Sequence, residues 1–275
     1  MKKQILILLT LFTICGVKAQ ISNNPIEYQI GISGSNYLGE ISQLESNSHL
    51  IANSPSVYGV RDLRLRATSP SISLGARVYL YDPIWVKGSV NIGYLSGDDN
   101  YLDRSRNLSF RTPIIETALQ LGVKYRNISL FAGIGAFYFN PMAKYDGQWY
   151  SLRELGTEGQ GLAPTRSKYD PIGLCLPLGF SYDIEISDNS LLSISYGFRF
   201  TNTDYIDDVS TTYYENDLLK QSRGDVAAAL GDRTPELDGG YLHYPNETRG
   251  NPKTKDRYMF FGIEYCFFLK TTDKK

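Results

Sequence analysis

Apolar and polar side chains alternate with a period of two along much of the chain. Between residues 27 and 33, for example, Tyr28, Ile30 and Ile32 alternate with polar or small residues. This alternation is typical of a β-strand with one apolar face. The same pattern predicts eight strands, within residues 27–33, 71–80, 85–94, 115–125, 128–138, 172–184, 192–200 and 259–269.

The connections between these strands alternate between short and long. Short turns are expected near Asp82, Arg126 and Asp188, whereas the other connections are long and polar, within residues 36–69, 96–110, 141–170 and 202–256. Strict alternation places every short turn at one end, as in bacterial outer-membrane barrels. A sheet in hydrocarbon must also close, because open edges would leave N–H and C=O groups unpaired. The pattern therefore predicts an all-β fold, an eight-stranded antiparallel transmembrane β-barrel with long external loops and short periplasmic turns.

Periodicity alone leaves open which face of the barrel is inside. A soluble, lipocalin-like barrel would enclose its apolar face. Two features favour the reverse. Tyr residues gather on the apolar face near strand ends, as an interfacial girdle requires, at Tyr94, Tyr125, Tyr138, Tyr182 and Tyr196.

The second feature is the composition of the other face, which mixes small residues with charges of both signs. An eight-stranded barrel is narrow enough for such side chains to fill it, and wide, water-filled lumens belong to barrels of about sixteen strands. A general diffusion channel is therefore not expected. We expect a lumen-facing polar core of Arg77, Lys87, Glu116, Lys124, Arg199 and Glu264.

The N-terminus predicts export. Lys2 and Lys3 precede an apolar run that is followed by Val17-Lys18-Ala19, where a signal peptidase finds small residues. We expect residues 1–19 to be a signal peptide and residues 20–275 to form a single barrel domain, placed in the outer membrane after export through the inner membrane. The alternatives are an uncleaved anchor, for which the run is short of about 20 residues, and lipidation at Cys15.

Two cysteines remain after removal of this leader, Cys175 and Cys266. They fall on the sixth and eighth strands, which a whole strand separates. Two strand spacings of about 4.8 Å exceed the limit of about 7 Å between the Cα atoms of a disulfide. Both thiols are therefore expected to be free.

Composition restricts the chemistry. The formal net charge is −1, and Lys and Arg are scattered among Asp and Glu, so nucleic acid is not an expected partner. His49 and His243 are the only histidines. His243 near Asp238 and Glu247 could belong to a lipid-modifying enzyme at the barrel rim, but a solvated loop histidine is the simpler interpretation.

Acidic residues concentrate in the segment 203–208, where three carboxylates and neighbouring hydroxyls could ligate calcium. Turn formation and solvation explain the same residues. No His or Cys cluster has zinc spacing. We expect no catalytic residue, no cofactor and no metal.

Several loop sequences carry information beyond their periodicity. They lie in residues 34–40, 139–141, 157–161, 203–213 and 249–258. Together they resemble the PorG-like outer-membrane barrels of Bacteroidetes, a family associated with the type IX secretion system. The residues that carry the resemblance are Tyr37, Leu38, Gly39, Asn140, Pro141, Glu158, Gly159, Asp204, Tyr205, Asp207, Asp208, Arg249, Gly250 and Asp256.

This resemblance covers nearly the whole mature chain. It implies a non-enzymatic outer-membrane barrel that anchors or assists the type IX secretion and gliding machinery. The implied partners are outer-membrane lipid and the periplasmic ring lipoprotein and ring protein. The alternative is a structural or ligand-binding barrel unrelated to secretion, whose loops around Asn53, Gln160 and Asp225 engage a surface ligand.

Overall fold

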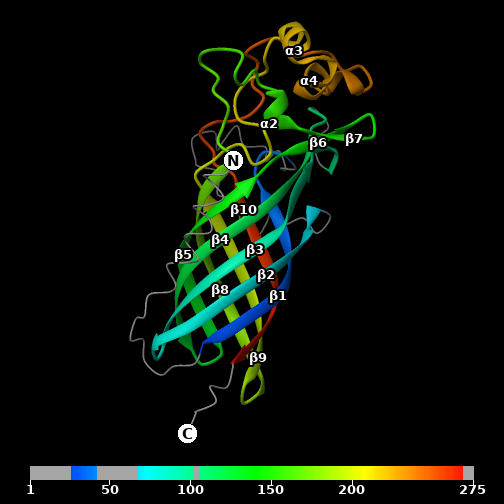
Figure 1. Ribbon diagram of the computed structural model, residues 1–275. Coiled ribbons are helices and arrows are strands. Elements are labelled where there is room, and N and C mark those ends of the chain that lie inside the picture. The colour runs from blue at the N-terminus through cyan, green and yellow to red at the C-terminus, as the bar shows by residue number, and fades with distance from the viewer. Residues whose placement is uncertain (1–25, 42–66, 102–105, 269–275) are drawn as a thin grey trace, which may run out of the picture.

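Eight long antiparallel strands close into a ring in the computed structural model, which describes residues 26–41, 67–101 and 106–268 (Figure 1). Each strand pairs with its neighbours along the chain, and the pairing of the first strand with the last completes the ring. The barrel strands are β1 (Glu27–Leu38), β2 (Ser69–Tyr81), β3 (Ile84–Asp98), β4 (Ser109–Tyr125), β5 (Ile128–Phe139), β8 (Ile172–Ser187), β9 (Ser190–Thr201) and β10 (Arg257–Phe268).

The two ends of the barrel differ as the sequence predicts. The hairpins β2–β3, β4–β5 and β8–β9 turn tightly at one end, where the start of β1 also pairs with the end of β10. We call this the turn end. The opposite end carries the long connections and is called the loop end (Figure 1). Its elements are η4 (Asp99–Tyr101), β6 (Met142–Tyr145), β7 (Gln148–Ser151), α2 (Leu152–Leu155), α3 (Asn216–Arg223), α4 (Asp225–Gly231) and η5 (Thr234–Glu236).

Apolar side chains cover the outside of the barrel. Ile32 on β1 is 73% exposed and Leu119 on β4 is 55% exposed, and similar residues alternate along each of the eight strands. In water such a surface would be strongly unfavourable, because apolar area costs about 25 cal/mol for each Å² left exposed. In hydrocarbon it is the expected lining. The fold is an eight-stranded antiparallel transmembrane β-barrel, and the predicted strands and their orientation are confirmed.

One girdle residue is placed differently from the prediction. Tyr196 lies midway along β9, opposite Phe261, rather than near a strand end. Its ring stacks on Phe180 of the neighbouring strand, with 5.7 Å between the ring centroids. Tyr125 and Tyr182 lie near the turn end, where an interfacial ring belongs.

No helix in the described part of the chain is long and apolar enough to cross a membrane. The expected signal peptide, residues 1–19, lies outside the described residues, as do His49 and Asn53. Cys175 and Cys266 are buried on β8 and β10 as free thiols, in agreement with the prediction.

Candidate functional site

The lumen is filled by charged side chains that pair across the barrel. Arg77 lies 2.7 Å from Glu27 and 3.2 Å from Asp183, whose carboxylate also receives Lys124 at 2.7 Å. Lys87 pairs with Glu264 at 2.9 Å. Glu27 and Arg77 lie on adjacent strands, whereas the other pairs join strands that are not neighbours, so their side chains extend into the lumen and fill it.

A second lumen centre is built on Glu116. It pairs with Arg199 at 3.0 Å and accepts hydrogen bonds from the Asn91 amide at 2.9 Å and the Tyr258 hydroxyl at 2.6 Å. Glu116 is fully buried, with 0% of its surface exposed. A cavity of about 40 Å³ lies among these side chains, which is enough for roughly three water molecules at 10–15 Å³ each.

The structure thus places all six expected core residues inside the barrel: Arg77, Lys87, Glu116, Lys124, Arg199 and Glu264. Two of their acidic partners, Glu27 and Asp183, were not chosen from the sequence. Both alternate with apolar residues on their strands. The period of two therefore indicates that their side chains face the lumen.

An apolar cluster closes the barrel at the loop end. Ile206 and Val209, from the segment after β9, are buried in the same cluster as Phe137 and Phe139 of β5. The remaining members come from every part of the loop end and include Leu95, Leu108, Phe110, Leu152 and Leu230. The loops are therefore packed on the mouth as a lid with its own core.

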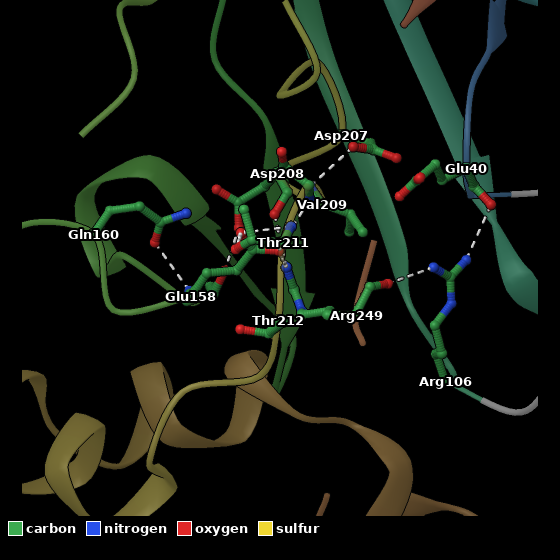
Figure 2. A network of polar contacts seen from close by, with 12 residues as sticks. Glu40, Arg106, Glu158, Gln160, Asp207, Asp208, Val209, Thr211, Thr212 and Arg249 are labelled. Atoms are coloured by element: carbon green, nitrogen blue, oxygen red, sulfur yellow. Dashed lines mark hydrogen bonds and ion pairs between the residues drawn. The ribbon is translucent and has the colours of Figure 1, made fainter. Parts of the chain in front are cut away.

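A polar network lies on this cluster and joins the loops to one another (Figure 2). Glu158, from the connection between α2 and β8, accepts the backbone N–H groups of Ser210 and Thr211 at 3.0 and 3.1 Å. Arg249 lies 3.1 Å from the same carboxylate and also donates to the carbonyl of Asp208 at 2.7 Å. Glu158 and Arg249 are both buried, so each neutralises a charge that would otherwise be costly there.

Arg106 connects two further loops to this network. Its guanidinium donates to the carbonyl of Arg249 at 2.9 Å and to the carbonyl of Glu40 at 3.0 Å, and it pairs with Asp99 at 3.2 Å. All four long connections of the barrel therefore meet at the network, as Figure 2 shows for Glu40, Arg106, Glu158 and Arg249.

The aspartates of the segment 203–208 are buried, whereas solvation was expected. Asp208 is 0% exposed and accepts hydrogen bonds from Thr157 and from Tyr169, the latter at 2.6 Å. Asp207 and Asp256 both contact the hydroxyl of Tyr37. The partners come from loops that are distant in sequence, which is why local composition gave the wrong environment.

Two glycines of the loop motifs are required by close approach. A Cβ on Gly39 would overlap the Tyr37 hydroxyl and the Asp256 carboxylate. A Cβ on Gly250 would overlap the carboxylate of Glu40 and the backbone of Ser210. Both positions therefore exclude larger residues for steric reasons.

The remaining motif residues fix the paths of the loops. Asn140 accepts a hydrogen bond from the Ser151 hydroxyl at 2.8 Å, and the Pro141 carbonyl accepts the N–H of Leu152 at 2.9 Å. Tyr205 stacks on Tyr169 with 4.5 Å between the ring centroids. Leu38 packs with Met259 in a small separate cluster, Gly159 has a positive φ of 78°, and Asp204 accepts the Ser210 hydroxyl at 2.8 Å.

Burial dominates the electrostatics of this acidic network. It raises the pKa of Asp208 to about 7, although Arg249 favours the carboxylate. Burial, reinforced by the charge of Asp207, raises the pKa of Glu40 to about 8. Burial and the charge of Glu40 raise the pKa of Asp204 to about 8. The network therefore holds protons at a pH where carboxyl groups are ordinarily ionised.

His243 is held in place rather than solvated, which corrects the simpler interpretation. Its Nδ1 lies 3.0 Å from Asp232 and 3.2 Å from the Thr234 hydroxyl, and its ring stacks on Tyr213 at 4.0 Å. The carboxylate partner is thus Asp232, not one of the two acids suggested by proximity in sequence. These contacts tie the segment after α4 to the lid.

Within the described residues, no group of three or more His, Cys, Asp or Glu is arranged to hold a metal ion.

Two contributors to the network, Arg106 and Tyr169, were missed by the sequence argument because they lie in polar connections without periodicity or a motif. Gln160 marks one of the loops that the alternative function assigns to a surface ligand. It is buried and accepts the N–H of Glu158 at 2.9 Å.

Comparisons with known proteins find only distant similarities, all of them to solved structures. No protein-family model matches the sequence, and no curated protein matches it either. Among solved structures, Ail of Yersinia pestis in complex with a heparin analogue, sucrose octasulfate, is 10% identical, with 90% of this chain and 100% of that chain covered and a TM-score of 0.42. Neisserial surface protein A is 10% identical, with 90% and 98% covered and a TM-score of 0.35.

The N-terminal β-barrel domain of Pseudomonas aeruginosa OprF is 8% identical, with 89% of this chain and 100% of that chain covered and a TM-score of 0.33. These similarities are too distant to carry an inference about ligands or partners. A closed barrel with an apolar outer belt is the architecture of an outer-membrane protein. The PorG-like assignment and the secretion role stay predictions.

Proposed function

We propose that this chain is a non-enzymatic, non-conducting outer-membrane barrel that anchors the type IX secretion and gliding machinery. In this role the turn end, with the start of β1 and the end of β10, faces the periplasm, where the ring lipoprotein and the ring protein are the partners. The lid of packed loops faces outward.

The convergence of the loop motifs carries the proposal. Residues of three motif segments that resemble the PorG-like family meet in buried contacts at the barrel mouth, namely Tyr37 at the end of β1, Glu158 before β8, and Asp207 with Arg249 between β9 and β10. Resemblance at positions scattered along the sequence would be weak evidence. Resemblance at positions that together build one lid favours a shared architecture of the whole barrel.

The filled lumen supports the same role because it argues against a diffusion channel. The ion pairs of Arg77 and Arg199 occupy the interior, and the apolar cluster around Ile206 closes the mouth. The working surfaces of such a protein are its two ends and its lipid-facing wall.

A pull-down from detergent-solubilised native outer membrane tests the proposal. Tagged wild-type protein is expected to retain the ring components, and a deletion strain is expected to lose secreted cargo and gliding. A turn-end variant, Arg126→Glu with Asp188→Lys, changes two exposed side chains and should release the ring components. The matched loop-end control, Lys253→Glu with Asp238→Lys, should retain them. Normal export in the deletion strain would reject the proposal.

A second function has one observation in its favour. The loop end contains an open hollow of about 340 Å³ lined by Tyr145, Asn216, Asp232 and Leu242, among others. This is the size of a small-molecule site. A ligand-binding barrel unrelated to secretion would export cargo normally after deletion and would lose ligand binding when Tyr145 is replaced by Ala.

A further inference from the structure

The hydroxyl of Tyr37 makes more short contacts than its single proton can satisfy. Its oxygen lies 2.6 Å from Asp207 Oδ2 and 2.6 Å from Asp256 Oδ1, and it accepts the N–H of Glu40 at 3.1 Å. A phenol donates one hydrogen bond only. Because 2.6 Å is an O–H···O distance, a proton must lie in each of the two short contacts. One of the two carboxyl groups therefore carries the second proton and donates it to the phenol oxygen.

The second oxygen of each carboxyl group is fixed by the backbone. Asp207 Oδ1 accepts the N–H of Val209 at 2.9 Å, and Asp256 Oδ2 accepts the N–H of Ile206 at 2.8 Å. Neither group can therefore rotate away from Tyr37 without losing a backbone hydrogen bond. All three side chains are buried, so bulk water does not separate them.

The excess of acidic groups around Asp207 and Asp256 also favours protonation of this pair. Charged groups of both signs surround the pair. Glu40, Asp204, Arg106 and Arg249 interact with it electrostatically. These four groups interact in turn with the acidic Asp99, Glu158 and Asp208 and with the basic Lys255. With Asp207 and Asp256 included, carboxyl groups exceed cations by a wide margin. Buried carboxylates in such excess repel one another, and protonation relieves the repulsion.

The titration behaviour agrees with this geometry. Burial raises the pKa of Asp207 to about 6, with the Tyr37 hydrogen bond opposing the shift. Burial and the negative charges of Asp207 and Asp204 raise the pKa of Asp256 well above its ordinary value. Asp256 is thus the group that holds the proton when Asp207 is ionised.

We propose that Tyr37, Asp207 and Asp256 form a proton-binding site that latches the loop lid to the barrel mouth. Tyr37 belongs to the end of β1, Asp207 to the segment inserted into the mouth, and Asp256 to the entry of β10. One proton shared across the phenol joins these three parts of the chain. When the proton leaves for water, two carboxylates face one phenol proton and the segment 204–210 is pushed outward.

The direction of the pH effect follows from the raised pKa values. A carboxyl group whose folded-state pKa lies above its unfolded value, about 4, stabilises the fold fully below that value. This contribution is lost as the pH rises through the folded pKa. Ionisation of Asp207, whose pKa is raised to about 6, leaves one proton on the pair, so the latch stays closed at that step. It should loosen at higher pH, as Asp256 loses its proton, because the pKa of Asp256 is raised well above its ordinary value.

Hydrogen exchange on the full-length protein in lipid bilayers tests the latch. Peptides covering residues 36–41 and 204–210 report on it, and peptides from β4 serve as the internal reference for an intact barrel. After correction for intrinsic exchange, protection of the latch peptides should fall by about tenfold or more between about pH 6 and pH 9, since one pKa unit corresponds to tenfold. The β4 peptides should not change.

Asparagine substitutions separate a proton site from a merely structural contact. In Asp256→Asn or Asp207→Asn the amide N–H replaces the acid O–H, and the remaining carboxylate accepts the phenol proton. Each single variant should keep its protection and lose the pH dependence. In the double variant an amide oxygen can accept the phenol proton only if that side chain turns and gives up its backbone hydrogen bond, so the latch peptides should exchange fast at every pH. Asp238→Asn, at an exposed residue, should behave as wild type.

Infrared spectroscopy supplies a second signature. The carbonyl band of a neutral carboxylic acid in wild type at about pH 6 should lose intensity in each single variant. A pH-independent wild-type latch would overturn the proposal, and so would single variants that exchange as fast as the double variant. Protection that depends on added calcium and is lost with a chelator would overturn it too, because a metal would then replace the proton.

Discussion

Removal of Arg199 should strand the buried carboxylate of Glu116 in the lumen. Arg199 donates from Nε and Nη2 to Glu116, both at 3.0 Å. In Arg199→Leu two strong donors remain on the carboxylate, the Asn91 amide and the Tyr258 hydroxyl. Breaking one side of a buried ion pair costs about 3–5 kcal/mol, and the remaining donors place this case near 3 kcal/mol.

The assay is urea unfolding of the protein in lipid vesicles, followed by the fluorescence of Trp85, which is buried in the lumen. A Trp149→Phe background removes the other tryptophan. The loss of about 3 kcal/mol corresponds to a change of roughly 150-fold in the unfolding equilibrium. Glu116→Gln added to Arg199→Leu should recover much of this loss, because it removes the stranded charge and keeps both donors.

The control is Lys220→Met, which breaks the exposed pair with Asp225 on the loop lid. It should leave the unfolding midpoint unchanged, since exposed ion pairs contribute little. The reasoning is refuted if Arg199→Leu costs less than about 1 kcal/mol, or if the double variant is no more stable than the single one.

Three further outcomes are expected. Gly39→Ala forces a Cβ into the latch and should destabilise the lid by about 1–3 kcal/mol, seen as faster loop proteolysis, whereas Gly88→Ala, which meets only open space, should not. Leu119→Arg on the lipid-facing wall should cost about 2–4 kcal/mol in bilayers, whereas Leu218→Arg on the exposed face of α3 should cost nothing measurable. His243→Ala should speed cleavage of the segment after α4 in the same proteolysis assay. Lipid turnover by wild type that this variant abolishes would instead favour a rim enzyme.

The barrel was predictable because lipid and lumen impose opposite demands on neighbouring residues. Each side chain of a barrel strand faces either lipid or the lumen. The alternation of Ile30 and Ile32 with polar residues therefore identifies the strand even when its neighbouring strands are unknown. The pairs themselves were not predictable. Arg77 meets Asp183, 106 residues away, because the stagger of the strands brings them to one level of the lumen.

The lid was recognisable in its residues but not in its structure. Tyr37 and Asp207 were both identified as motif residues, but their contact was not predicted, because 170 residues separate them in the chain. Local composition treated the acidic segment as a solvated turn, since acidic residues are almost never buried without partners. Its burial depends on donors that are distant in sequence, Tyr37 of β1 and Thr157 and Tyr169 of the connection before β8. Irregular backbone has no period from which such contacts could be predicted.

The orientation of the barrel wall is tested most directly by spin labels at two adjacent positions of β4, Leu119 and Gln120, in protein reconstituted into bilayers with its free cysteines replaced by alanine. Leu119 is exposed on the outside and Gln120 is buried in the lumen. The label at Leu119 should collide with oxygen dissolved in the lipid, and the label at Gln120 should be shielded from it. A lipid-accessible label at Gln120, or a water-accessible label at Leu119, would contradict the account.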